Sequence, residues 1–201
     1  MLGAELDSDA YLQHLRQALK NLDRGAIHRW ADALYRAWDE ARFVFVFGNG
    51  GSGTTATHFS EDLGKSTLRP EDLADESKKR LKIMSLTDNL GWILAVGNDV
   101  GYDQIFQQQL MNYGSAGDLV IAISGSGNSP NVINAVEWAK RHGLHTFGIS
   151  GYSGGQLKEI QDDGLHVPVD DMGMVESIHL CVFHWVLNDV YGRINRAGRY
   201  A

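Results

Sequence analysis

The sequence predicts an α/β fold, a three-layer sandwich in which a five-stranded parallel sheet is flanked by helices and preceded by an N-terminal helical segment. Three observations support this expectation. Short apolar runs alternate with amphipathic helical stretches along the 201 residues. Some runs, such as Leu119–Ile123, are apolar at successive positions, which is typical of strands covered on both faces. Glycine- and serine-rich loops follow two of these runs, where a strand would pass into a helix.

The N-terminal segment, residues 1–40, is predicted to form two helices. Apolar residues between positions 8 and 39 recur at helical spacing, and Gly25 is expected to separate the two helices. Because their apolar surface is suited to contacts between subunits, we expect this segment to contribute to an oligomer.

The remaining elements follow from the alternation of apolar runs and helical periodicity. Five strands are predicted at 42–47, 82–86, 118–123, 145–149 and 164–167. Six helices are predicted at 54–66, 89–96, 102–113, 129–142, 154–160 and 174–194. The polar stretch 69–80 indicates a surface insertion. Since no repeat or linker interrupts this pattern, residues 1–201 are expected to form one domain with a sizeable core.

Composition narrows the function classes. A formal charge of −7 and a pI near 5.5 argue against sequence-independent binding of nucleic acid, which needs a basic face. No apolar stretch is long enough for a membrane span, and the mixed N-terminus does not resemble a secretory signal. The single cysteine, Cys181, lies in an apolar helical run and is interpreted as a buried thiol in a reducing compartment. We therefore expect a cytoplasmic protein.

The two small-residue loops indicate a phosphorylated ligand. The first loop is Gly48–Thr55 and the second is Ser124–Ser129, each at the predicted carboxyl end of a strand. Small residues allow backbone N–H groups to approach an anion, and hydroxyl groups add further donors. One such loop is explained by an ordinary tight turn, whereas two of them favour an anion site.

Histidine and acidic residues accompany these loops. His58 and Asp62 are four residues apart and share a helix face, although a salt-linked surface pair is the ordinary explanation. Glu176, His179 and His184 interrupt an otherwise apolar last helix, where polar groups are costly unless they are paired. A structural hydrogen bond is a sufficient explanation for one buried histidine, whereas two histidines and an acidic residue on one apolar helix favour a functional role.

Two histidines and two carboxylates would make a divalent metal site: His58, Asp62, Glu176 and His184. Helix geometry limits this hypothesis, because Glu176 and His184 lie roughly 12 Å apart along a straight helix. Either Glu176 precedes the regular helix, or two subunits complete the site together. Asn98 and Asp99 precede Val100, Gly101 and Tyr102, where the helical pattern breaks, and this position fits the end of a helix. Asp88 is interpreted as the N-cap of the helix that follows it, without a chemical role.

Five stretches together carry a resemblance to a known family. They are GNGGS…HFSEDL at 48–63, VGNDVGYDQIF at 96–106, GDLVIAISGSGNSPNVINA at 117–135, GISGYSGG at 148–155 and VESIHLCVFH at 175–184. From about Phe43 to Asp189 the chain resembles the sugar isomerase (SIS) domain family, and within it the phosphoheptose isomerases. The resemblance implies a homotetramer with active sites between subunits. It also implies conversion of sedoheptulose 7-phosphate to D-glycero-D-manno-heptose 7-phosphate through an enediol, in heptose biosynthesis, with Zn²⁺ or another divalent metal.

Site roles are carried over by the same resemblance. The phosphate loop would be Ser124, Gly125, Ser126 and Ser129. The other sugar-phosphate contacts would be Asn49, Gly50, Gly51, Ser52, Asn98, Asp99 and Glu176. The metal positions would be His58, Asp62, Glu176 and His184, and the catalytic acid/base pair would be Asp62 and His184.

Four departures from the family pattern leave alternatives open. Asp62 stands where Glu is usual, Glu176 where Gln is usual, and Gly125 where Thr is usual, while Gly173 replaces a common Asp. A shorter carboxylate at position 62 retracts its oxygens by roughly 1.5 Å, enough to alter catalysis. Two alternatives are therefore an isomerase of another phosphosugar in secondary metabolism and a non-catalytic SIS-domain regulator that binds a replication-initiation protein.

Overall fold

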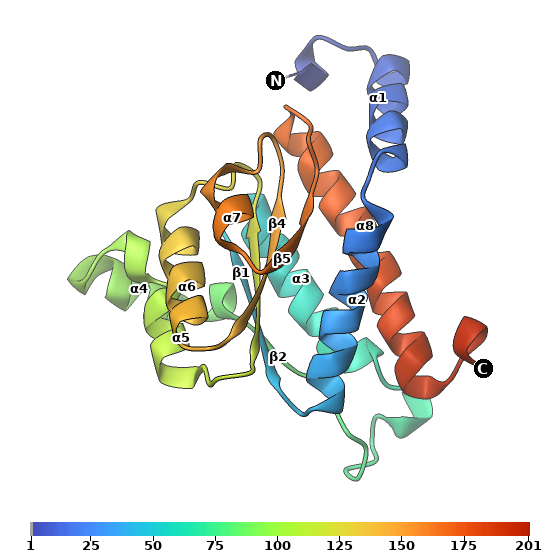
Figure 1. Cartoon of the computed structure of the whole chain (residues 1–201), viewed down its shortest axis with the longest axis vertical. Helices are drawn as coiled ribbons and strands as arrows, with labels where there is room; N and C mark the ends of the chain where they lie inside the picture. Colours follow the sequence, from blue (N-terminus) through green and yellow to red (C-terminus); the bar gives the residue numbers. More distant parts are fainter. Residues whose placement is uncertain (1) are drawn as a thin grey trace.

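The protein is built on one parallel sheet, which the computed structural model describes within residues 2–201 (Figure 1). The five strands lie in the order β2-β1-β3-β4-β5, and every pairing is parallel. Their bounds are β1 (Phe43–Gly48), β2 (Lys82–Ser85), β3 (Leu119–Ser124), β4 (His145–Ser150) and β5 (Asp163–His166). The predicted five-stranded α/β sandwich is thus confirmed.

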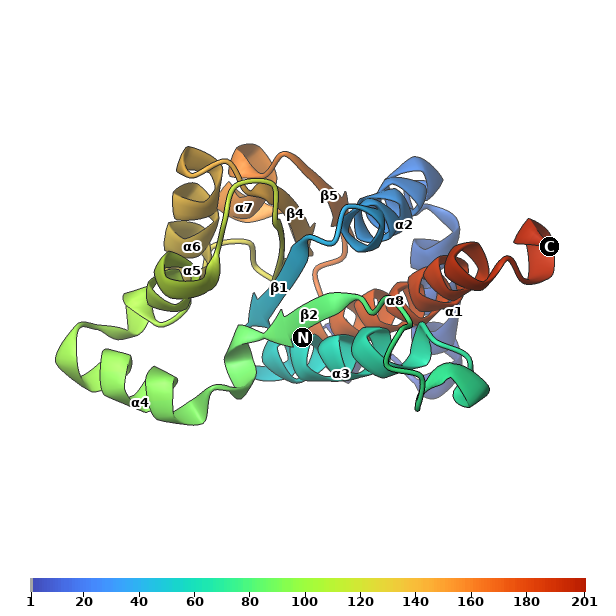
Figure 2. The same ribbon diagram turned by 90° about the horizontal axis from the view of Figure 1, so that it is seen from below.

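Eight α-helices accompany the sheet within the described residues. They are α1 (Ser8–Lys20), α2 (Arg24–Asp39), α3 (Gly50–Ser66), α4 (Leu90–Asp99), α5 (Gln107–Tyr113), α6 (Pro130–Arg141), α7 (Gly155–Ile160) and α8 (Met172–Asn195). Helices α2, α3 and α8 cover one face, and α5, α6 and α7 cover the other (Figures 1 and 2). Helix α4 projects from the edge of the molecule in both views.

Strand side chains point alternately into two cores. Val44 and Val46 of β1 pack into the core under α2, α3 and α8. Phe45 and Phe47 of the same strand pack into the core under α5 and α6. Because both faces of β1 are buried, its apolar run is continuous rather than alternating. The unbroken run that marked this strand in the sequence therefore has a direct cause in the three-layer packing.

Several predicted boundaries are wrong in detail. Two N-terminal helices are present, but Gly25 lies in the first turn of α2, and the chain turns before it, where Asn21 ends α1 and Asp23 precedes α2. The predicted helix 102–113 is interrupted between a 3-10 turn at Tyr102–Gln104 and α5. Ile105 and Phe106, which lie between the two helical segments, are buried in the core.

Two single-residue predictions are also wrong. Asp88 does not cap α4, because Asn89 is the residue that precedes the helix and Asp88 instead accepts a hydrogen bond from the hydroxyl of Thr57. Cys181 is exposed rather than buried, because α8 turns that position away from the core. The polar insertion 69–80 lies mostly exposed, as predicted. Among the described residues, the helices are too short or too polar to cross a bilayer.

Candidate functional site

The two small-residue loops meet at one edge of the sheet. They follow β1 and β3, which are neighbours in the sheet and lie where the strand order changes direction, the usual ligand position in such folds. Together with the first turns of α8 they enclose a cavity of about 250 Å³. Its lining residues are Asn49, Gly50, Gly51, Ser52, Ile123, Ser124, Gly125, Ser126, Ser129, Met172 and Glu176. Thus nine of the residues predicted to contact the sugar phosphate share one cavity.

Amide groups at the start of α3 remain available in the first loop. The helix begins at Gly50, whose φ of +53° suits glycine, and Asn49 makes no capping hydrogen bond from its side chain. The Asn49 amide instead exchanges two 2.9 Å hydrogen bonds with the amide of Asn131 and accepts one from the Tyr102 hydroxyl at 3.1 Å. Because Asn49 is engaged away from the helix end, an anion in the cavity faces uncapped N–H groups.

Sequence reasoning did not single out Asn131 or Tyr102. Asn131 is buried in the first turn of α6, and Tyr102 belongs to the 3-10 turn after α4. Both lie in stretches that carry the family resemblance, but their residue types alone do not mark them as partners of Asn49. Their contacts with Asn49 depend on how α6 and the α4 region pack against the end of β1. Local sequence patterns carry no signal of this kind.

Serine hydroxyls line the second loop. Ser124 Oγ accepts from the Gly127 N–H at 3.1 Å and lies 3.4 Å from Ser129 Oγ, while Ser126 Oγ accepts from the Asn128 N–H at 3.2 Å. A side chain at Gly127 would overlap the carbonyl of Gly154, and its φ of +69° also requires glycine. The loop is therefore held open by its own hydrogen bonds, with hydroxyls facing the cavity.

The first turn of α8 closes the cavity from the side. Asp171 caps this helix by accepting from the Met174 N–H at 3.0 Å, and it also accepts from the Gly3 N–H at 2.9 Å. Met172 then lies against Gly125: a Cβ at position 125 would overlap the Met172 sulfur and lie 2.9 Å from its methyl carbon. The Met172 side chain therefore occupies the space that a side chain at position 125, where the family pattern has Thr, would need.

We expect Gly125→Thr to lower the free energy of unfolding by about 1 kcal/mol, because the added atoms displace only the flexible end of the half-buried Met172 side chain. The double variant Gly125→Thr, Met172→Ala should recover part of this loss, with a coupling energy of about 0.5 kcal/mol. Urea unfolding of the two single variants and the double variant measures it. Strictly additive effects would show that the two positions do not share this space.

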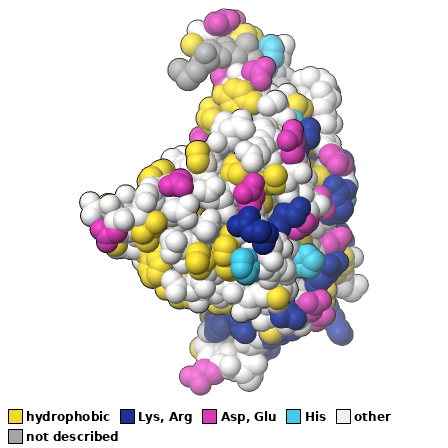
Figure 3. Space-filling model, turned by 60° about the vertical axis from the view of Figure 1, so that its left-hand side comes forward, with side chains coloured by type: hydrophobic (Ala, Val, Ile, Leu, Met, Phe, Trp, Pro, Cys, Tyr) yellow, Lys and Arg dark blue, Asp and Glu magenta, His cyan; other side chains and the backbone are white. Residues whose placement is uncertain are grey.

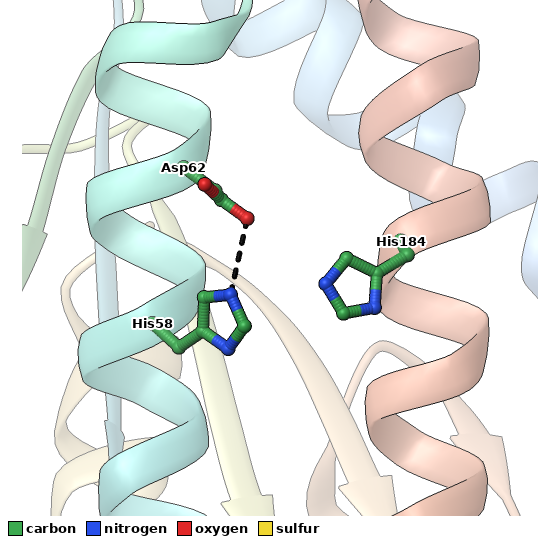
Figure 4. Close-up of side chains that lie close together, drawn as sticks. All are labelled: His58, Asp62 and His184. Carbon is green, nitrogen blue, oxygen red and sulfur yellow. Dashed lines mark ion pairs between the residues drawn. The ribbon is translucent and has the colours of Figure 1, made fainter.

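A histidine–aspartate cluster lies further along the same two helices. His58 Nε2 is 3.2 Å from an Asp62 carboxylate oxygen on α3, and the ring of His184 on α8 is 5.2 Å from the His58 ring, centre to centre. One donor atom from each of the three residues lies within 4.8 Å of the other two. Figure 4 shows the three side chains pointing toward one another between the helices. All three are half-buried, so a metal ion could be held here within reach of a ligand from solvent.

Glu176 does not join this cluster within one chain. Helix α8 already begins at Met172, so the alternative in which Glu176 precedes the regular helix is wrong. Two turns of helix, roughly 12 Å, therefore separate it from His184. Its carboxylate lies against Gly51, where a Cβ would overlap both of its oxygens. The structure thus places Glu176 in the anion cavity and the other three predicted metal ligands together.

Three other predicted residues lie apart from both groups. Asn98 and Asp99 end α4, are exposed, and hydrogen bond to each other at 2.7 Å rather than lining the cavity. His179 is buried under the end of β4, and its Nε2 lies 3.2 Å from the carbonyl oxygen of Ser150. Burial lowers the pKa of His179 to about 4, only partly offset by that hydrogen bond. For His179 the simple explanation, a structural hydrogen bond, is therefore sufficient.

Residues 10–151 match the SIS domain family, so the class of protein is that of SIS domains. The probable phosphoheptose isomerase of Thermoplasma acidophilum is 36% identical over 181 residues, covering 90% of this chain and 96% of the relative. The phosphoheptose isomerase of Geobacter sulfurreducens is 34% identical over 192 residues, covering 94% and 97%.

Solved structures agree with these relatives. A phosphoheptose isomerase from Neisseria gonorrhoeae has a TM-score of 0.81 at 25% identity, covering 94% of this chain and 98% of that one. A phosphoheptose isomerase from Francisella tularensis has a TM-score of 0.81 at 29% identity, covering 90% and 95%. The chain therefore belongs to the phosphoheptose isomerase family of SIS domain enzymes.

Proposed function

We propose that this enzyme is a metal-dependent aldose–ketose isomerase that converts sedoheptulose 7-phosphate to D-glycero-D-manno-heptose 7-phosphate through an enediol. One observation carries the proposal. The cavity formed by the glycine- and serine-rich loops and the cluster of His58, Asp62 and His184 lie along the same pair of helices, α3 and α8. An anionic end and a reacting end of one substrate can therefore be bound at the same time.

The spacing of the two groups supports a long substrate. Gly51 at the cavity and His58 in the cluster are seven residues apart on α3, which corresponds to about 10 Å along the helix. An open-chain seven-carbon sugar phosphate extends over a distance of this order, whereas a three-carbon sugar phosphate is much shorter. The separation thus favours a phosphate held at the loops and a carbonyl group at the cluster.

The donor set of the cluster suits zinc or a similar divalent ion. Two imidazole nitrogens and one carboxylate oxygen are typical ligands of a catalytic zinc site, which leaves a position for a substrate oxygen. When bound, such an ion supplies a Lewis acid that stabilises the charge developing on an enediolate oxygen. His58, Asp62 and His184 would hold it, and His58 Nε2 and an Asp62 carboxylate oxygen already lie 3.2 Å apart.

Proton transfer is assigned to Asp62 and His184. The reaction requires a base that moves a proton between adjacent carbons and a second group that moves the hydroxyl proton. Both side chains are half-buried and face the space between α3 and α8, where the reacting end of the sugar would lie. One of the two would serve as the base and the other as the hydroxyl shuttle, and since both would also hold the ion, a residue that acts as the base would have to exchange that role for its role as ligand when the substrate enters.

We further propose a homotetramer that works in the cytoplasm, with sites completed between subunits. Large exposed apolar side chains support the assembly: Leu12, Leu90, Leu94, Val100 and Tyr102 are each at least 60% exposed. Figure 3 shows one face on which many hydrophobic side chains lie on the left and in the centre, whereas Lys and Arg lie on the right and along the lower edge. Asn98 and Asp99, exposed at the end of α4, would then contact a sugar bound in a neighbouring copy.

Proton exchange tests the proposed reaction directly. We expect the protein with sedoheptulose 7-phosphate in heavy water to exchange the proton on the carbon next to the carbonyl, as followed by NMR, and a chelator to abolish the exchange. Exchange only with another ketose phosphate would favour a different substrate, as the changes at Asp62 and Glu176 suggest. A folded, metal-loaded protein that binds but exchanges no ketose phosphate would favour a regulator.

A further inference from the structure

Glu176 introduces a negative charge into a cavity built for an anion. Its carboxylate lies against Gly51, at the start of α3, where the helix presents uncapped N–H groups. Met172 and Glu176 are one helical turn apart on α8 and both line the cavity. Glu176 therefore faces the position that a phosphate group would approach.

The charge has no counter-ion in the cavity wall. Among the described residues, the lining contains no lysine, arginine or histidine, so the anion site depends on backbone N–H groups and serine hydroxyls. The Glu176 carboxylate lies beside Gly51 at the amino-terminal end of α3, where a helix carries partial positive charge. An incoming anion must therefore enter beside a carboxylate of the same sign.

We propose that Glu176 makes the cavity selective for a polyhydroxylated phosphate ester over a bare inorganic anion. A bare dianion offers only acceptors and is repelled by the carboxylate. A sugar phosphate carries hydroxyl groups beside its phosphate, and a hydroxyl that donates to Glu176 forms a charge-assisted hydrogen bond that offsets the repulsion. This inference rests on the proposed function only in requiring that the cavity takes a sugar phosphate.

Glu176→Gln tests the inference, because it removes the charge with little change in shape. Titration calorimetry at pH 8 compares sulfate with glucitol 6-phosphate, an unreactive polyhydroxylated phosphate ester. We expect the variant to bind sulfate at least tenfold more tightly than the unchanged protein does, whereas its affinity for glucitol 6-phosphate should change by less than threefold. The selectivity for the sugar phosphate should then fall by at least about threefold.

Glu61→Gln is the matched control. Glu61 lies on α3, is exposed and pairs with Lys65 at 3.3 Å, so its replacement removes the same charge from the molecule but not from the cavity. The control should leave both affinities unchanged. Equal sulfate affinity in Glu176→Gln and the unchanged protein would overturn the inference about Glu176. If neither ligand binds to any of these proteins, the anion cavity itself is refuted, and with it the proposed function.

Discussion

Replacing His184 by alanine is expected to lower kcat/KM for isomerisation by about 1000-fold or more. The variant loses one of the three donors gathered between α3 and α8 and also one of the two groups assigned to proton transfer. General acid–base groups alone contribute about 10²- to 10⁴-fold. The exchange rate in heavy water measures the loss, and metal analysis of the purified variant separates loss of the ion from loss of the proton-transfer group.

Two further variants sharpen this result. Asp62→Ala should reduce turnover as strongly, while Asp62→Glu restores the carboxylate at the length usual in the family and tests whether the position of the oxygens limits the rate. His14→Ala is the control, since this histidine is exposed on α1 and far from the cluster. Undiminished turnover in His184→Ala would refute the assignment of roles.

Acidification is expected to destabilise the fold through His179. Because burial lowers its pKa to about 4 from an unfolded value near 6.5, the unfolded chain binds this proton at a higher pH than the folded protein. The contribution of the neutral ring to stability is therefore complete above pH 6.5 and is lost as the pH falls toward 4. One pKa unit corresponds to about 1.4 kcal/mol, so the loss approaches about 3 kcal/mol.

The measurement is urea unfolding at several pH values between 7 and 4. His179→Gln retains a donor for the carbonyl of Ser150 but does not titrate, so its stability should fall less steeply over this range. His14→Gln is the control, because it removes an imidazole from an exposed position and should leave the pH dependence of stability unchanged. If the unchanged protein and His179→Gln show parallel pH profiles, the buried ring does not carry this dependence.

Much of the site was recognisable in the sequence because its parts are local. A small-residue loop after a buried strand needs only neighbouring residues to form, so Gly50–Ser52 and Ser124–Ser126 could be predicted to bind an anion. The pairing of His58 with Asp62 also follows from helical spacing alone. Helix ends were predicted less accurately, as between the 3-10 turn at Tyr102–Gln104 and α5, because the helical spacing of apolar residues continues across such a break.

The partners contributed by α8 could not be read from the sequence in the same way. Glu176 and His184 are residue types that bind metal ions, yet Glu176 lines the cavity between the two loops and His184 belongs to the histidine–aspartate cluster. The role of Met172 could not be predicted, since only the folded structure places its side chain in the space beside Gly125. These contacts depend on how far α8 is shifted along α3.

By itself, the amino-acid sequence determined the strands, the two hydroxyl-rich turns and the spacing of polar groups along each helix, since these depend on short-range backbone preferences and burial period. Tertiary structure alone decided that Glu176 meets Gly51, 125 residues earlier, and that His184 meets His58. The physical reason is that the alignment of α3 and α8 results from packing both helices on one sheet. No local pattern encodes that alignment.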